Sequence, residues 1–315
     1  MTSPYQLDPQ VAEAFAALAP KFADMPAVAR GDWQGLRRST NDQYDIITAV
    51  RGPRPPEVRC EELTIAVGDG AQLDARWYTH GDGRPGSAVV YVHGGGMIAG
   101  TLDHYDDVVG HYVLQSGVPF LSLAYRLAPE AQGLRPAEDV LAALLWLGEH
   151  ADRRGLDPER IAVMGDSAGG GIAASAAILA RDRGIALAHQ ILIYPMLDDQ
   201  VTSVSPAIEP FLTWTPDANA TAWAARRGED DVVEPAAVPA RVGDLRAVAP
   251  AYIEVGDLDL FRNESLLYAQ RLAAADVPLE LHVHASAPHG YDLVTREAEV
   301  SRRALLDRTR VLRAL

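Results

Sequence analysis

The sequence contains a single cysteine, Cys60, among its 315 residues. One cysteine excludes an internal disulfide, a thiolate cluster and the paired cysteine spacing of a zinc finger. The metalloprotease pattern H-E-x-x-H and the phosphate-loop pattern G-x-x-x-x-G-K-[ST] are also missing. We therefore expect neither a metal ion nor a cofactor.

Long apolar runs are missing as well. No stretch approaches the roughly 18 apolar residues that a membrane-spanning helix needs. Residues 1–19 lack a positively charged segment followed by an apolar core, so we expect no signal peptide. The expected location is cytoplasmic.

Positive charge is scarce relative to negative charge. The chain has 43 acidic and 28 basic residues and a formal net charge of −15. This balance argues against nucleic acid and anionic membrane surfaces as partners. We expect a small-molecule partner, and the sequence leaves a homodimer open. With 48% hydrophobic residues, the chain can bury a core large enough for one α/β domain.

The most informative motif is Gly-Asp-Ser-Ala-Gly-Gly at residues 165–170. The preceding run Ile161–Met164 is short, apolar and partly β-branched, as in a buried strand, and residues 168–180 favour a helix of small side chains. A serine between glycines at a strand-to-helix turn is typical of a nucleophile elbow. The alternative is a glycine-rich turn that caps a buried helix. A second motif upstream favours Ser167 as a nucleophile.

That second motif is His-Gly-Gly-Gly at residues 93–96, after the strand-like run Ser87–Val92. Attack by a serine on a carbonyl builds negative charge on oxygen, and backbone N–H groups stabilise that charge. We expect the oxyanion donors to be the N–H groups of Gly94, Gly95 and Ala168. The imidazole of the motif is expected to brace the loop by hydrogen bonding.

Three motifs in this order resemble the hormone-sensitive-lipase-like branch of the α/β-hydrolase carboxylesterases: residues 93–96, Tyr125–Glu130 and Gly165–Gly170. The resemblance runs from about residue 60 to the C-terminus. It implies an α/β-hydrolase fold with an eight-stranded, mostly parallel sheet, helices on both faces and a helical cap. It also implies hydrolysis of esters with short and medium acyl chains. The sequence departs from the family pattern at Met97-Ile98, where an aromatic residue is common, and at Gln132, where many relatives carry histidine.

A serine nucleophile needs a histidine base and a carboxylate that orients it. The α/β-hydrolase order is serine, acid, histidine, so the candidate bases are His189, His282, His284 and His289. Two of them alternate within the strand-like run Leu279–His284, where a structural role is more common. His289 follows that strand in a loop and opens His-Gly-Tyr, which fits the family's final motif. We therefore expect His289 to be the general base.

The loop after the strand-like run Ala251–Val255 contains two candidate acids, Asp257 and Asp259. The resemblance favours Asp259, because it directly precedes the Leu-Phe-Arg-Asn-Glu run at residues 260–264. The alternative readings are a turn residue for Asp257 and a residue at a helix N-terminus for Asp259.

We expect residues 1–50 to form an N-terminal cap segment and residues 51–315 to form the catalytic domain. In the first, Asp8-Pro9 opens an amphipathic helix. A second cap element is expected at about 203–225. The pocket walls are expected to include Met97, Ile98, Phe211 and Trp214.

These observations favour a serine carboxylesterase that forms an acyl-enzyme. An amidase or peptidase could use the same triad, and a non-catalytic small-ligand receptor could use the same fold. Comparing hydrolysis rates on matched ester and anilide substrates would distinguish an esterase from an amidase or peptidase. The presence of all three triad residues argues against the second.

Overall fold

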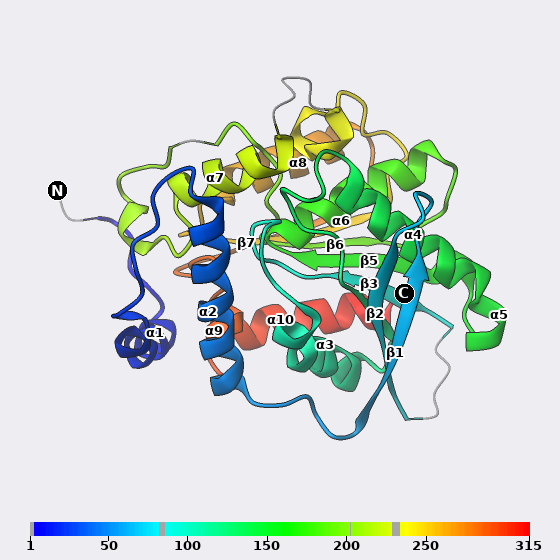
Figure 1. Cartoon of the computed structure of the whole chain (residues 1–315), viewed down its shortest axis with the longest axis horizontal. Helices are drawn as coiled ribbons and strands as arrows, with labels where there is room; N and C mark the ends of the chain where they lie inside the picture. The colour runs from blue at the N-terminus through cyan, green and yellow to red at the C-terminus, as the bar shows by residue number, and fades with distance from the viewer. Residues whose placement is uncertain (1–2, 82–85, 202, 229–233) are drawn as a thin grey trace.

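The computed structural model describes residues 3–81, 86–201, 203–228 and 234–315, which build an eight-stranded sheet (Figure 1). The strands are β1 (Val58–Ala66), β2 (Gln72–His80), β3 (Ala88–Val92), β4 (Phe120–Leu123), β5 (Ile161–Asp166), β6 (Gln190–Ile193), β7 (Ala251–Gly256) and β8 (Leu279–His284). Their order is β1-β2-β4-β3-β5-β6-β7-β8. Strand β2 is antiparallel to both of its neighbours, and the other pairs are parallel. This confirms the predicted eight-stranded, mostly parallel sheet.

Helices cover both faces of the sheet, with α3 and α10 below it and α4, α6 and α8 above it in Figure 1. Successive side chains of a strand point to opposite faces. Val89 and Tyr91 of β3 therefore join the core formed with α3 and α10, whereas Val90 joins the core under α4, α6 and α8. The helices are α3 (Leu102–Ser116), α4 (Arg135–Glu149), α5 (Ala151–Arg154), α6 (Ala168–Asp182), α8 (Arg262–Ala274), α9 (Tyr291–Val294) and α10 (Glu299–Arg313).

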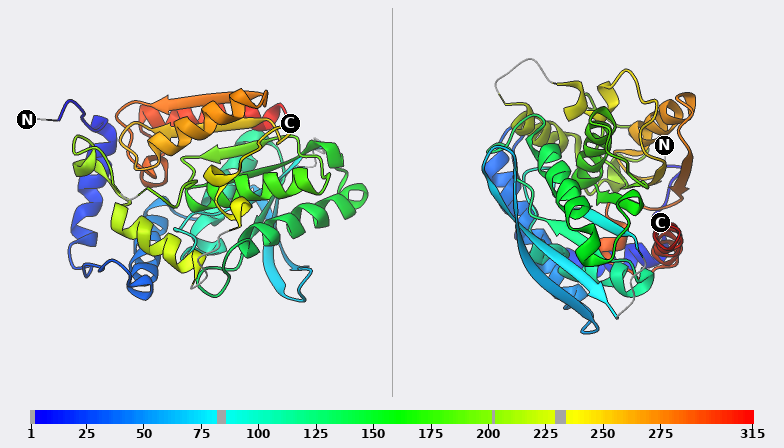
Figure 2. Two further views of the ribbon diagram at one scale, coloured as in Figure 1. Left: turned by 90° about the horizontal axis from the view of Figure 1, so that it is seen from above. Right: turned by 90° about the vertical axis from the view of Figure 1, so that its right-hand side faces the viewer.

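Three further helices, α1 (Pro9–Phe22), α2 (Trp33–Arg51) and α7 (Pro216–Arg227), lie at one end of the sheet (Figure 2). Helix α1 begins after Asp8, whose carboxylate accepts hydrogen bonds from the N–H groups of Gln10 and Val11. Helix α1 packs against α9, and α2 packs against both α3 and α7. Of the helices described, none has the length and apolarity needed to cross a lipid bilayer.

Candidate active site

Ser167 occupies a sharp turn between the end of β5 and the start of α6. Its φ of 56° and ψ of −122° are rare for a residue with a Cβ. A Cβ on Gly165 would lie 2.4 Å from the carbonyl oxygen of Gly169, and a Cβ on Gly169 would lie 2.1 Å from that of Val92. The glycines on either side of the serine are therefore required by close contact between backbone segments.

The three residues predicted as a triad lie within hydrogen-bond distance of one another. His289 Nε2 is 2.8 Å from Ser167 Oγ, and His289 Nδ1 is 2.7 Å from Asp259 Oδ2. Asp259 is fully buried, and its other oxygen accepts a hydrogen bond from the N–H of Phe261. A carboxylate facing Nδ1 holds the imidazole proton there and leaves Nε2 able to accept the serine proton. The arrangement can thus remove a proton from Ser167 and stabilise the resulting imidazolium.

Two aromatic rings enclose the His289 imidazole. The ring of Tyr194 lies edge-on at 4.7 Å between centroids, and the ring of Phe261 lies edge-on at 5.0 Å. The Tyr194 hydroxyl donates a 2.9 Å hydrogen bond to Asp292, which holds the tyrosine ring in place. Sequence reasoning did not identify Tyr194, because its contact with His289 joins segments almost a hundred residues apart.

The other candidate acid and bases have partners elsewhere. Asp257 Oδ1 accepts a 2.7 Å hydrogen bond from the N–H of Ser286, and burial raises the pKa of this carboxyl group. His282 lies 2.6 Å from Glu280, and His284 lies 3.9 Å from Glu254. None of these side chains is hydrogen-bonded to Ser167 or His289 in the described part of the chain. The structure therefore brings together Asp259, not Asp257, with His289.

Gly94 differs from the expectation for the oxyanion loop. Its N–H donates a 3.1 Å hydrogen bond to Asp166 Oδ1, so it is already engaged. Asp166 also accepts hydrogen bonds from the hydroxyl groups of Tyr91, at 2.9 Å, and Tyr105, at 2.7 Å. Burial raises the pKa of Asp166 to about 6, and the two tyrosine hydrogen bonds offset part of this rise. Asp166 thus anchors the start of the glycine loop to the serine elbow.

The next two glycines lie beside the serine. Gly95 and Gly96, with φ of 117° and 62°, line the same pocket as Ser167. Ala168 is the first residue of α6, so its N–H has no acceptor within the helix. Sequence reasoning did not single out Gly96, although it belongs to the same glycine run. The geometry therefore makes the N–H groups of Gly95, Gly96 and Ala168 the candidate donors in the described part of the chain.

His93 is buried beneath this loop. Its Nδ1 lies 2.7 Å from the carbonyl oxygen of Gly94, and the Tyr125 hydroxyl donates a 3.0 Å hydrogen bond to the His93 carbonyl oxygen. Burial lowers the pKa of His93 to about 4, so its imidazole is neutral near pH 7. These contacts agree with the expectation that His93 braces the loop.

The pocket at Ser167 has a volume of about 330 Å³. Its lining includes Trp214 from the segment before α7, His289 from the loop after β8 and Leu293 of α9. Helices α1 and α2 contribute a further set of side chains, which sequence reasoning did not assign to the pocket: Phe15, Phe22, Thr40, Gln43, Tyr44 and Ile47. The only early signal for them was the amphipathic pattern of the first helix.

Of the four residues expected in the pocket walls, only Trp214 is among the residues that line this pocket. The other three lie elsewhere. Met97 is 1% exposed, and its Sδ lies 3.3 Å from Nη1 of Arg226. Ile98 is fully buried, and its carbonyl oxygen accepts a hydrogen bond from Arg37. Phe211 lies in a short 3-10 turn, Glu209–Phe211, outside the lining. The loop turns back after the glycines and directs the residues that follow into the core.

One group of described residues has ligand atoms close enough together for a cation: Glu280, His282 and Asp307, at the outer edge of β8 and on α10. Arg310 already pairs with Glu280 and with Asp307 there. The group lies outside the pocket at Ser167, and we assign it no part in the chemistry of that pocket.

Comparison with known proteins agrees with this geometry. A family model described as alpha/beta hydrolase fold matches residues 89–293. The esterase LipI of Mycobacterium tuberculosis is 38% identical over 250 residues, which cover 76% of this chain and 77% of LipI. The carboxylesterase NlhH of the same organism is 35% identical over 280 residues, which cover 82% of this chain and 85% of NlhH.

The solved structure of a bacterial heroin esterase superposes with a TM-score of 0.86 at 32% identity and covers 98% of both chains. The match extends to the helices outside the sheet, because almost the whole of each chain is aligned. The chain therefore belongs to the α/β-hydrolase family, in its hormone-sensitive-lipase-like branch of carboxylic ester hydrolases.

Proposed function

We propose that the chain hydrolyses carboxylic esters through an acyl-enzyme on Ser167. The observation that carries this proposal is the continuous hydrogen-bonded series from Ser167 through His289 to Asp259, with heavy-atom distances of 2.8 and 2.7 Å. His289 takes the serine proton as the hydroxyl attacks the ester carbonyl, then gives it to the departing alcohol. Water enters next, and His289 activates it to release the acid.

The negative oxygen of the tetrahedral intermediate would be held by the N–H groups of Gly95, Gly96 and Ala168. Gly95 and Gly96 line the same pocket as Ser167, and Ala168 directly follows the serine as the first residue of α6, whose N-terminus adds the positive end of the helix dipole. In this proposal Gly94 is an anchor rather than a donor, because its N–H is bonded to Asp166.

The proposed substrates are esters with short to medium acyl chains. The side chains of Phe15, Phe22 and Ile47 give the pocket apolar walls, and its volume of about 330 Å³ limits what fits. Each buried methylene contributes about 0.8 kcal/mol, so the rate should rise over the first few carbons. It should then fall once the chain meets the wall, because overpacking costs about 1–3 kcal/mol.

We infer that residues 1–50 and residues 203–225 act together as a cap, with residues 51–315 forming the catalytic domain. The N–H of Gly31, between α1 and α2, donates a 2.8 Å hydrogen bond to Thr221 of α7. The hydroxyl of Thr213 donates a 2.8 Å hydrogen bond to the carbonyl oxygen of His289. These contacts connect both segments to each other and to the triad loop. A cytoplasmic location and a homodimer stay predictions.

The test uses an organophosphonate and a pair of matched substrates. Intact mass should show one phosphonate adduct per chain, and peptide mapping should place it on Ser167. Ser167→Ala should abolish both labelling and hydrolysis of a butyrate ester, whereas Ser175→Ala, on α6, should keep both. Labelling of another residue while Ser167 stays free would refute the proposal. A higher rate on the matched anilide than on the ester would indicate an amidase instead.

A further inference from the structure

One polar face of α2 contacts the oxyanion loop, residues 94–100, and the helix α3 that follows it. Residues three and four apart in a helix lie on the same face. Arg37, Asn41, Tyr44 and Thr48 have this spacing. The first two are hydrogen-bonded to the oxyanion loop, and the other two are hydrogen-bonded to residues of α3. Helix α2 belongs to the proposed cap, yet this face is directed at the segment that carries two of the proposed oxyanion donors.

The oxyanion loop has a backbone conformation that needs support from outside. Gly95, Gly96, Met97 and Gly100 all have positive φ, between 62° and 117°. Positive φ is unfavourable at a residue with a Cβ such as Met97, and it persists only where the surroundings fix it. Within the loop, the carbonyl oxygen of Gly95 accepts a 2.9 Å hydrogen bond from the N–H of Ala99, which closes a tight bend. The direction of the Gly95 and Gly96 N–H groups depends on this bend.

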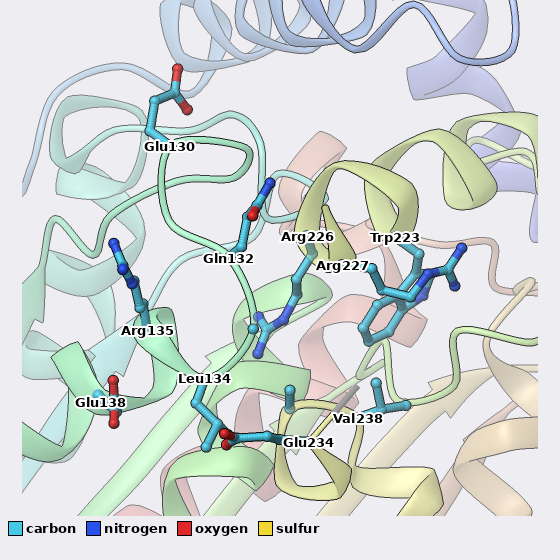
Figure 3. Close-up of a pocket in the computed structure, with 12 residues that line it drawn as sticks. Glu130, Gln132, Leu134, Arg135, Glu138, Trp223, Arg226, Arg227, Glu234 and Val238 are labelled. Atoms are coloured by element: carbon cyan, nitrogen blue, oxygen red, sulfur yellow. The ribbon is translucent and has the colours of Figure 1, made fainter. Parts of the chain in front are cut away.

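Arg37 contacts the middle of the bend. Its Nε donates a 2.6 Å hydrogen bond to the carbonyl oxygen of Ile98, and its Nη2 donates a 2.6 Å hydrogen bond to that of Ala128, in the loop after β4. The same guanidinium donates hydrogen bonds of 2.8 and 2.6 Å to the carboxylate of Glu130. Figure 3, a close-up of a neighbouring cavity, shows Glu130 extending towards the blue ribbon of α2. Because the guanidinium presents several donors in a fixed plane, one side chain joins α2 to two loops.

Asn41 contacts the end of the oxyanion loop. Its Oδ1 accepts a 3.0 Å hydrogen bond from the N–H of Gly100. A Cβ on Gly100 would lie 2.6 Å from Nδ1 of His93 and 2.7 Å from the carbonyl oxygen of Gly94. The end of the loop therefore lies directly against its start, and a displacement of Gly100 would displace the glycines that precede the serine pocket.

Arg37 and Asn41 contact the loop rather than the substrate pocket. Neither is among the described residues that line the pocket at Ser167, whereas Tyr44 of the same face does line it. An effect of Arg37 or Asn41 on turnover would therefore pass through the loop. Loss of one oxyanion donor costs about 10²–10³ in kcat, and a misplacement of about 1 Å can cost about 10².

We propose that Arg37 and Asn41 are positioning residues that hold the oxyanion loop in the conformation able to bind the negative oxygen of the tetrahedral intermediate. This inference rests on the proposed ester hydrolysis at Ser167. It gives α2 a role beyond that of a pocket wall, because the helix that lines the pocket also orients donors for the chemical step.

The proposal is tested with full-length variants on a soluble butyrate ester. Each rate is divided by the number of Ser167 sites that an organophosphonate labels at completion, which removes any loss caused by unfolded chains. Arg37→Met and Asn41→Ala should lower kcat per labelled site by about 10- to 100-fold, with KM changed less than about threefold. Asn41→Asp should recover most of kcat, because a carboxylate oxygen can also accept the Gly100 N–H. Arg38→Met, at the next and exposed position of α2, is the matched control and should keep the wild-type kcat and KM.

Butylboronic acid gives a second readout, which a general loss of stability would not change. It adds to the serine hydroxyl as a tetrahedral adduct and places an oxygen where the negative oxygen of the intermediate would lie. Its inhibition constant should rise in Arg37→Met and Asn41→Ala in proportion to the loss of kcat/KM. It should stay at the wild-type value in Arg38→Met.

Wild-type kcat per labelled site in Arg37→Met or Asn41→Ala would refute the role of that residue. A rise in KM without a loss of kcat would also refute it, as would a loss of kcat with an unchanged inhibition constant for butylboronic acid. If Arg37→Met does not fold, Arg37→Lys should lower kcat about threefold or more, because an ammonium group lacks the planar fork, and wild-type kcat there would be decisive against the proposal. Absence of both labelling and hydrolysis in the wild type would instead refute the proposed function itself, so the two failures are distinguishable.

Discussion

Replacing Asp166 by asparagine should change how the stability of the protein depends on pH. The Asp166 carboxylate is buried and accepts hydrogen bonds from the Gly94 N–H and the Tyr91 and Tyr105 hydroxyls. Burial, only partly offset by the tyrosine hydrogen bonds, raises its pKa from 3.8 to about 6. The folded protein therefore loses this proton less readily than the unfolded chain does.

The size of the effect follows from that difference in pKa. A raised folded-state pKa gives stability that is fully present below about pH 4 and is lost as pH rises through about 6. A difference of about two units corresponds to about 3 kcal/mol in the free energy of unfolding. Roughly half of this falls between pH 5 and pH 8. Asp166→Asn stays neutral over the whole range, so its stability relative to the wild type should rise by about 1.5 kcal/mol between those two pH values.

Urea unfolding followed by tryptophan fluorescence, at intervals from pH 5 to pH 8, measures this difference. The quantity compared is the change with pH in the difference between the two free energies of unfolding. The difference at any single pH is not used, because the asparagine amide also alters the hydrogen bonds. Asp42→Asn, at an exposed position on α2, controls for the loss of one negative charge. Parallel stability profiles for Asp166→Asn and the wild type would refute the assignment of a raised pKa to Asp166.

Four further predictions concern activity on a soluble butyrate ester. Asp259→Asn should lower kcat by about 10⁴, since the amide can hold the wrong imidazole tautomer, whereas Asp257→Asn should cost far less. Gly96→Ala should lower kcat at least about tenfold, because its Cβ would lie 2.5 Å from the Trp214 ring at a φ of 62° and displace the oxyanion loop. Specificity constants across acyl lengths should peak at short to medium chains, without interfacial activation. Deleting residues 1–50 should change that acyl-length profile, whereas the far-ultraviolet circular dichroism spectrum should lose only the helical signal of α1 and α2.

Each of these predictions has a contrary outcome. A larger loss in Asp257→Asn than in Asp259→Asn would move the acid to the earlier position. Normal turnover by Gly96→Ala would show that the loop tolerates a side chain beside Trp214. Faster hydrolysis of emulsified long-chain triglyceride than of the butyrate ester would contradict a small pocket. An unchanged acyl-length profile after the deletion would exclude α1 and α2 from substrate selection.

The elbow at Ser167 was predictable, because the constraint that produces it is local. A Cβ on Gly165 would meet the carbonyl oxygen of Gly169, so this part of the requirement lies within five consecutive residues. Gly169 must lack a Cβ for a different reason, because the backbone of β3 passes close to it at Val92. The short apolar strand before the elbow and the small-residue helix after it were equally visible in the sequence. The choice of Asp259 over Asp257 depended on the family resemblance.

The donors of the oxyanion loop could not be assigned in the same way. Three consecutive glycines have the same conformational freedom, and only the position of Asp166 on β5 shows that Gly94 is already bonded. The pocket walls are a similar case. Helices α1 and α2 precede the first strand, yet their packing against α9 and α7 brings Phe15 and Ile47 to the serine. Met97 and Ile98 follow the glycines directly but point into the core.

The sequence by itself indicated the nucleophile elbow, because the short apolar run, the glycines around Ser167 and the small-residue helix are visible within a few residues. The fold class and the chain order of the predicted triad followed from the motifs that resemble the hormone-sensitive-lipase-like family. Only the tertiary structure decided that the Gly94 N–H is bonded to Asp166 and which side chains wall the pocket at Ser167. Those properties depend on packing between segments far apart in the chain. Burial in turn sets the free-energy cost of each unpaired charge and hydrogen-bonding group.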